Sequence, residues 1–134
     1  MKFRHNIVGV WESRAYRVLR VEKDGSSQRT KRLPMRLQIS MVSQGTFRAK
    51  NTWRKPSDAG GGVEYVVGTI GYRGARGKSR MVLDMTEVGT PPTGGTRARM
   101  VAVLDPSGVM FLTYVGESSD AGQSFTTRLR RKNH

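Results

Sequence analysis

The amino-acid sequence predicts an all-β protein: a single domain over residues 1–134, folded as one antiparallel up-and-down barrel of about eight strands. Apolar segments recur at intervals of about a dozen residues, turn-forming residues separate them, and no window has the periodicity of an amphipathic helix. The length of 134 residues is typical of one domain.

Three strands are expected in the first part of the chain. Residues 9–21 form a long first strand that ends at the turn residues 23–27. Residues 30–42 alternate apolar and polar side chains, which gives a strand one apolar face and one polar face. Residues 46–54 form the third strand, because Ser43-Gln44-Gly45 is short enough for a hairpin turn.

Five further strands follow the glycine-rich loop at residues 56–62. They are rich in β-branched and aromatic residues, and glycine, proline and aspartate punctuate them, most strongly at Asp105-Pro106-Ser107-Gly108. The expected strands are residues 63–72, 78–88, 97–104, 109–116 and 123–131. Short connections favour a meander, and its closure into a barrel removes both exposed edges. The alternative is an open sandwich.

The first and last strands carry a motif. Gly9-Val10-Trp11 opens the first strand, and Arg128, Arg130 and Arg131 lie near the end of the last. This pattern resembles the signature of the calycin superfamily, which includes the lipocalins and avidin-like proteins. There a G-x-W opens the first strand, and an Arg or Lys of the last strand packs across the Trp ring. The resemblance implies a calycin-like barrel closed by Trp11 with Arg128 and Arg130.

The chain departs from both branches of that superfamily. It has Asp105-Pro106-Ser107-Gly108 where lipocalins carry a T-D-x motif. It has Glu12-Ser13-Arg14 where the avidin pattern places an Asn and a Ser that bind a ureido group. The resemblance therefore carries over a fold and a closure contact, and no ligand.

Methionines are frequent in the apolar phase of the expected strands. Their side chains are flexible and polarisable, so they can line a pocket that adapts to an apolar ligand. The alternative is that they fill a dry core. The expected lumen residues are Met35, Leu37, Ile39, Met41, Met81, Leu83, Met85, Met100 and Tyr114.

The sequence is strongly basic, with 24 Lys and Arg against 10 Asp and Glu and a formal net charge of +14. Arginines in the polar phase of a barrel project outward, where they attract polyanions. Two arginines on one strand lie about 7 Å apart, a spacing similar to that of phosphates along a nucleic-acid strand. The candidate residues are Arg73, Arg76, Lys78, Arg97 and Arg99.

Catalysis has little support in the sequence. There is no cysteine, and the two histidines, His5 and His134, lie at the termini. No catalytic residue, metal or cofactor is assigned. An enzyme remains an alternative in which Glu12 or Asp84 acts as a general base, and it requires a strongly raised carboxyl pKa in a cleft.

These observations favour a non-catalytic barrel that binds a small, largely apolar ligand in a Met-lined lumen. The alternative is a basic barrel that binds nucleic acid or another polyanion on its arginine-rich outer face. No apolar run reaches the roughly 20 residues of a membrane helix, so membrane insertion is not expected. The chain is expected in the cytoplasm if Met1 is its natural start, and to be secreted or periplasmic if a signal peptide has been removed.

Overall fold

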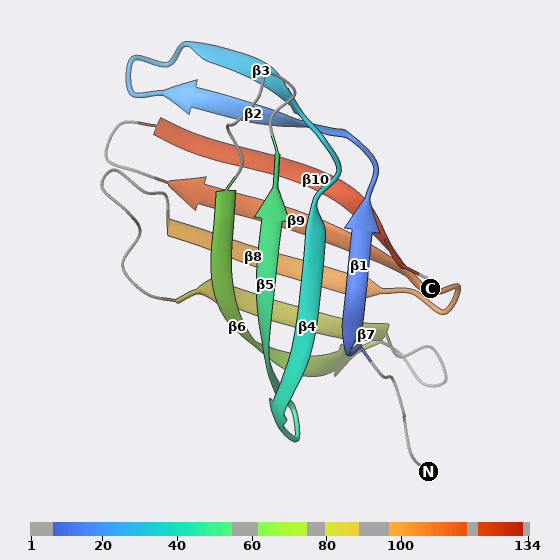
Figure 1. Ribbon diagram of the computed structural model, residues 1–134. Coiled ribbons are helices and arrows are strands. Elements are labelled where there is room, and N and C mark those ends of the chain that lie inside the picture. The colour runs from blue at the N-terminus through green and yellow to red at the C-terminus, as the bar shows by residue number, and fades with distance from the viewer. Residues whose placement is uncertain (1–6, 55–61, 75–79, 89–96, 118–120, 133–134) are drawn as a thin grey trace.

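The computed structural model describes residues 7–54, 62–74, 80–88, 97–117 and 121–132, which form ten strands and no helix (Figure 1). The strands are β1 (Gly9–Ser13), β2 (Tyr16–Glu22), β3 (Ser27–Arg32), β4 (Arg36–Ser43), β5 (Thr46–Trp53), β6 (Gly62–Arg73), β7 (Arg80–Glu87), β8 (Arg97–Leu104), β9 (Val109–Glu117) and β10 (Ala121–Arg131).

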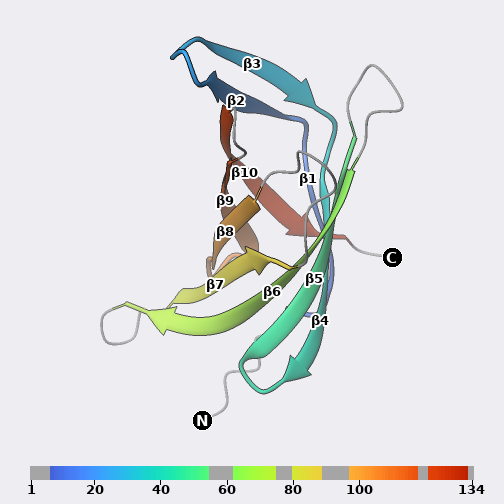
Figure 2. The same ribbon diagram turned by 90° about the vertical axis from the view of Figure 1, so that its left-hand side faces the viewer.

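Eight of these strands form a closed antiparallel barrel. Their order is β1-β4-β5-β6-β7-β8-β9-β10, and β1 also pairs with β10, which closes the ring. β2 and β3 continue the sheet from β10 as a hairpin that projects over one end of the barrel (Figure 2). The predicted all-β barrel of about eight strands is therefore confirmed, and the open sandwich is excluded.

The two additional strands arise because the first two predicted strands each divide. Residues 9–21 separate into β1 and β2 at Arg14 and Ala15, and residues 30–42 separate into β3 and β4 around Pro34. Proline has no backbone N–H to donate, so it interrupts the ladder where it stands. As a result, β1 and β4 remain in the barrel wall, whereas β2 and β3 leave it as a hairpin.

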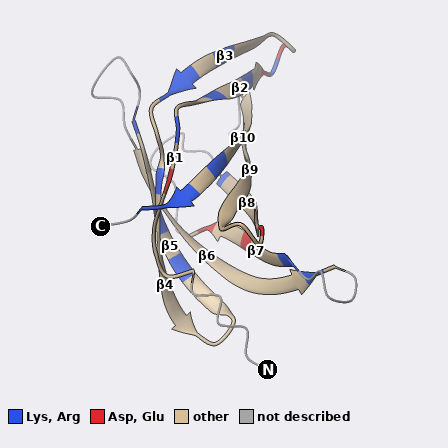
Figure 3. Ribbon diagram, turned by 90° about the vertical axis from the view of Figure 1, so that its right-hand side faces the viewer, with Lys and Arg blue, Asp and Glu red and all other residues tan. Residues whose placement is uncertain are grey.

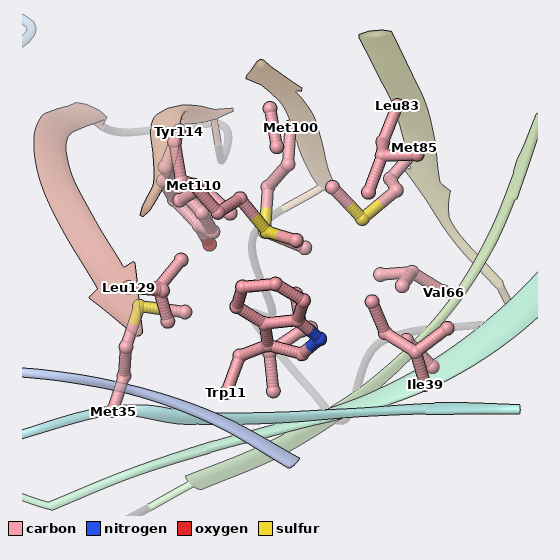
Figure 4. Close-up of a cluster of buried hydrophobic side chains, with 14 of the residues drawn as sticks. Trp11, Met35, Ile39, Val66, Leu83, Met85, Met100, Met110, Tyr114 and Leu129 are labelled. Carbon is pink, nitrogen blue, oxygen red and sulfur yellow. The ribbon is translucent and has the colours of Figure 1, made fainter. Parts of the chain in front are cut away.

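One apolar cluster fills the inside of the barrel, with side chains from the inward phase of every barrel strand. Trp11 is only 1% exposed and lies among Met35, Met100, Met110 and Leu129 (Figure 4). Burial of an indole of this size contributes roughly 4–6 kcal/mol as an upper limit, before entropy losses. Trp11 is thus a central element of the core.

Barrel closure at the seam between β1 and β10 depends on Arg131. Its guanidinium lies 4.6 Å from the centroid of the Trp11 ring, and its Nη1 donates to the carbonyl oxygen of Val8 at 2.7 Å. The indole Nε1 of Trp11 donates to the carbonyl oxygen of Ile7 at 3.0 Å. Gly9 has a φ of 134°, and a Cβ there would come within 3.0 Å of Nη1 of Arg131. Glycine before Val10-Trp11 is therefore required both by backbone conformation and by space.

The residues expected to close the barrel, Arg128 and Arg130, do not make this contact. Arg128 lies over the ring of Phe111, 5.2 Å from its centroid, and Arg130 is exposed opposite Glu12. Side chains alternate along a strand, so residues 128 and 130 face outward on the run of β10 that pairs with β9. Arg131 reaches the Trp ring because it is the direct register partner of Trp11.

Met41 also differs from its expected place in the lumen, since it is 42% exposed. β1 pairs with β4 only as far as Ile39, so Met41 lies beyond the closed part of the wall. The register between β4 and β5 then shifts between Met41 and Ser43. The alternation of apolar and polar residues in β4 continues to Met41, although the closed wall ends at Ile39.

The contrast between Met100 and Met41 is testable. Met100→Ala is expected to lower the free energy of unfolding by about 2–5 kcal/mol, because it leaves a cavity in a packed core. Met41→Ala, on the exposed end of β4, is expected to change it by about 0.5 kcal/mol or less. Urea unfolding of both variants measures the difference. Equal and small losses would mean that Met100 lines an open lumen.

Candidate functional site

The expected lumen residues other than Met41 all lie inside the barrel. Met35, Leu37, Ile39, Met81, Leu83, Met85 and Met100 are at most 3% exposed, and Tyr114 is 8% exposed. All of them belong to the single apolar cluster around Trp11 (Figure 4). Protein side chains therefore occupy the middle of the barrel, and a binding site has to be sought nearer its ends or in its wall.

The barrel wall is interrupted between β2 and β10. β10 pairs with β2 from Ala121 to Ser124 and with β1 from Leu129 to Arg131. The intervening residues of β10, 125–128, have no register partner on either strand. The break at residues 14–15 causes this gap, because β2 turns away from β10 to pair with β3. We call the gap the β2–β10 slot.

A pocket of about 570 Å³ lies at the β2–β10 slot. A volume of this size is within the range of small-molecule sites. One bank is formed by β2 with the residue before it and by β3, and the other by β9 and β10. Its lining residues are Ala15, Tyr16, Arg17, Leu19, Arg29, Thr113, Ser124, Phe125, Thr126 and Thr127.

The pocket has an aromatic floor that continues into the barrel. The ring centroids of Tyr16 and Phe125 lie 4.5 Å apart, and Phe125 stacks on Tyr114 at 4.7 Å with an interplanar angle of 14°. Tyr16 and Phe125 line the pocket, whereas Tyr114 points into the core. This row of rings joins the pocket to the interior of the barrel.

A buried polar cluster lies behind these rings. Asn51 and Glu64 are 2% and 7% exposed, and Nδ2 of Asn51 donates to Oε1 of Glu64 at 2.9 Å. The hydroxyl of Tyr114 also donates to the Glu64 carboxyl. Among the described residues, Oδ1 of Asn51 and Oε1 of Glu87 are buried without a hydrogen-bond partner. Unpaired buried acceptors of this kind are uncommon in proteins.

Burial dominates the protonation of this cluster. Burial, with a smaller contribution from the negative charge of Glu87, raises the pKa of Glu64 to about 7, although the hydrogen bond from Asn51 opposes the shift. Burial also raises the pKa of Tyr16 to about 12 and shifts the pKa of Tyr114 upward. The cluster can therefore hold or release a proton at Glu64 near neutral pH.

The sequence analysis did not identify Asn51, Glu64 or Glu87. Asn51 has the inward phase of Phe47 and Ala49 on β5, so a polar residue in an apolar phase was the available signal. Glu64 gave no such signal, because valines stand in both phases of residues 63–67. Only the register pair Asn51 with Glu64 brings these side chains together.

Glu12 and Asp84, the candidate general bases, lie in ion pairs away from the slot. Glu12 pairs with Arg36 at 2.7 Å and with Lys132 at 3.9 Å, and Asp84 pairs with Arg99 at 3.2 Å. Neither Glu12 nor Asp84 lines the pocket. The carboxyl group with the strongly raised pKa is that of Glu64 instead.

The candidate polyanion-binding residues do not form one patch. Arg73 pairs with Arg80 at the start of β7, whereas Arg99 pairs with Thr86 near its end. Six residues of strand separate the two positions by roughly 20 Å. Arg73, Arg97 and Arg99 are exposed, and Arg76 and Lys78 lie outside the described residues.

The described ranges contain neither a metal-binding cluster nor a membrane-spanning helix. No three His, Cys, Asp or Glu side chains in those ranges come together as a metal site would require. No part of the described chain forms an apolar helix of membrane-spanning length.

The closed antiparallel wall of eight strands with a buried tryptophan defines the protein as a β-barrel with the coarse architecture of calycins. A scan against protein-family models found no match to this chain. Searches of curated proteins and of solved structures also found no match. The geometry of the slot and of the cluster behind it is therefore the basis for inferring a function.

The raised pKa of Glu64 makes a prediction about stability. Because the folded state favours the protonated acid, the contribution of Glu64 to stability is complete below about pH 4.5 and is lost as the pH rises through about 7. The loss is roughly 3 kcal/mol at most. In Glu64→Gln this loss is expected to disappear. The free energy of unfolding of the variant therefore increases relative to that of the native protein between pH 5 and pH 8.

Urea unfolding of the native protein and of Glu64→Gln, at pH 5 and at pH 8, measures this difference. Other titrating groups contribute to both proteins and cancel in the comparison. Glu117→Gln, at an exposed position on β9, is the matched control and is expected to follow the native protein. An identical pH dependence of Glu64→Gln and the native protein would contradict the assignment.

Proposed function

We propose that the protein is a non-catalytic, calycin-like barrel that binds a small, largely apolar molecule at the β2–β10 slot. The observation that carries this proposal is the pocket of about 570 Å³ at the one place where β10 loses its partner strand. Small-molecule sites commonly combine an apolar surface with a few polar groups, and the slot offers both.

Part of the pocket lining offers apolar surface to a ligand. Tyr16, Phe125 and Leu19 supply apolar surface, and aromatic rings contribute large contact areas at a low entropy cost. Residues 125–128 of β10 have no strand partner on the slot side, so backbone polar groups there are accessible to a ligand. The slot is thus suited to a molecule that combines an apolar body with polar groups.

The proposed ligand is of the kind expected from the sequence, but its site is the β2–β10 slot and not the Met-lined lumen. The methionine-rich centre of the barrel is an unfavourable position, because its side chains pack around Trp11. The aromatic row from Tyr16 through Phe125 to Tyr114 connects the slot with that core. Flexible methionines behind the row can adjust to a ligand that displaces an aromatic ring.

Membership of the calycin superfamily is part of the proposal. Its support is the Gly9-Val10-Trp11 motif together with the guanidinium of Arg131 over the Trp11 ring. Both features lie at the seam that closes the barrel, although the cation is Arg131 rather than Arg128 or Arg130.

Blocking the slot tests the proposal. Thr126→Trp places an indole at an exposed, outward position of β10 that lines the pocket, where a strand tolerates tryptophan. Affinity for the neutral fluorophore N-phenylnaphthylamine is expected to fall by about tenfold or more, since the pocket would be filled. Fluorescence titration measures it.

Thr69→Trp is the matched control, because Thr69 is an exposed position of β6 away from the pocket lining. It is expected to bind the fluorophore as the native protein does. Equal affinity of Thr126→Trp and Thr69→Trp would place the bound molecule elsewhere. Native mass spectrometry of freshly purified protein adds a second readout, because a co-purified ligand appears as added mass.

A second candidate function is the binding of nucleic acid or another polyanion to the outer face. The net charge of +14 and the exposure of Arg73, Arg97 and Arg99 favour it. Arg99 already has an acidic partner in Asp84, and Arg73 lies at the other end of β7 from Arg97 and Arg99. This candidate is therefore placed second.

Titration with single-stranded oligothymidylate at several salt concentrations tests the second candidate. Affinity is expected to fall steeply with salt, because bound phosphates release counterions. Arg97→Gln/Arg99→Gln is expected to reduce the slope of log affinity against log salt by about 1.4. Arg48→Gln/Lys50→Gln on β5 is the control with equal charge. Affinity that does not change with salt would contradict this function.

A further inference from the structure

We infer that the β2–β10 slot selects small molecules that carry an anionic group, a carboxylate or a phosphate, and that Arg17 and Arg29 bind this group. The inference rests on the proposed function, since it names the chemistry of the ligand at that site. Both arginines are exposed and line the pocket.

The register of the hairpin brings the two guanidinium groups to the same face. Arg29 of β3 is the direct partner of Leu19 on β2, and Arg17 lies two residues from Leu19 on the same face of β2. Diagonal neighbours of this kind lie about 7–8 Å apart at the backbone, within reach of long side chains. Two arginines can therefore converge on one anionic group, each as a fork of N–H donors.

The opposite bank of the slot adds hydroxyl donors. Thr113 on β9 is the direct partner of Thr126 on β10, and Ser124 lies two residues before Thr126 on the same face of β10. All three line the pocket. Hydroxyl groups donate to carboxylate and phosphate oxygens, so the two banks together offer guanidinium and hydroxyl donors to one ligand group.

Within the described part of the chain, no acidic side chain lines the slot beside these donors. The ion pairs within the described ranges use Arg20, Arg36, Arg99 and Lys132, and they leave Arg17 and Arg29 without a carboxylate. Like charges on neighbouring strands repel each other, which is destabilising. An anion bound between Arg17 and Arg29 would replace this repulsion with attraction.

The surroundings of the slot have the same sign of charge. Lys31 is the direct partner of Arg17 on the hairpin, and Arg128 faces outward two residues from Thr126 on β10. Figure 3 shows Lys and Arg gathered on β2, β3 and β10. A concave site lined by one sign of charge concentrates ligands of the opposite sign.

Two fluorophores of one skeleton test the inference. Anilinonaphthalene sulfonate has the skeleton of N-phenylnaphthylamine plus one anionic group. The native protein is expected to bind the anionic fluorophore about tenfold more tightly than the neutral one. Arg17→Gln/Arg29→Gln is expected to remove most of this preference, so that the anionic and the neutral fluorophore bind this variant with affinities within about twofold of each other.

The control has the same net charge and retains the slot. Arg48→Gln/Lys50→Gln removes two exposed cations from β5, which contributes no lining residue, and is expected to keep the preference. A preference that persists in Arg17→Gln/Arg29→Gln, or that falls equally in both double variants, would overturn the inference. If the native protein binds both fluorophores alike, the inference fails and the proposed function stands. If it binds neither, both fail.

Competition identifies the anionic group. Octanoate, octyl phosphate and octanol share one chain length and differ in the head group. The two anions are expected to displace N-phenylnaphthylamine from the native protein at concentrations about tenfold lower than octanol. The more effective of the two anions identifies the group as carboxylate or phosphate. Displacement by octanol at the same concentration as both anions would overturn the inference.

Discussion

The contact of Arg131 with Trp11 is the interaction on which the barrel depends. β1 and β10 share only three register pairs, Trp11 with Arg131, Glu12 with Arg130 and Ser13 with Leu129. So short a seam gains little from backbone hydrogen bonds alone, and side chains must stabilise it. The guanidinium over the indole ties the last strand to the first, and its hydrogen bond to Val8 fixes the chain that leads into β1. Gly9 leaves the space that this arrangement needs.

The shortness of the seam also explains why the wall opens. β1 ends at Ser13, and the next residues lead into β2, which pairs with β10 again only from Leu19 onward. The pocket lies between these two pairings. A first strand that followed β10 throughout would close the slot and extend the ladder. The short seam and the candidate binding site are therefore consequences of the same division of the first strand.

The sequence predicted the barrel because its strands alternate regularly, and it placed most inward residues because alternation fixes the face of each side chain. It did not predict the slot, since Arg14-Ala15 contains neither glycine nor proline and nothing local indicates a break there. Pro34 was an available signal for the matching break, but the predicted strand of residues 30–42 ran through it. Asn51 and Glu64 became a cluster only through the register of β5 with β6, which sequence periodicity does not determine. Register also decides which arginine of the last strand faces Trp11, so the sequence did not single out Arg131 from Arg128 and Arg130.

The buried cluster behind the pocket is difficult to explain by stability alone. A hydrophobic residue at position 64 would avoid the desolvation that raises the pKa of Glu64 to about 7, and an apolar residue at position 51 would leave no unpaired amide oxygen. The cluster is instead joined to the pocket through Tyr114, which donates to Glu64 and stacks on Phe125. No residue of the cluster lines the pocket, and the contact between the two is the stacking of Tyr114 on Phe125. Groups that violate the pattern of a core are the expected exceptions to local consistency. Binding at the slot and the protonation of Glu64 would therefore be coupled through the ring of Tyr114.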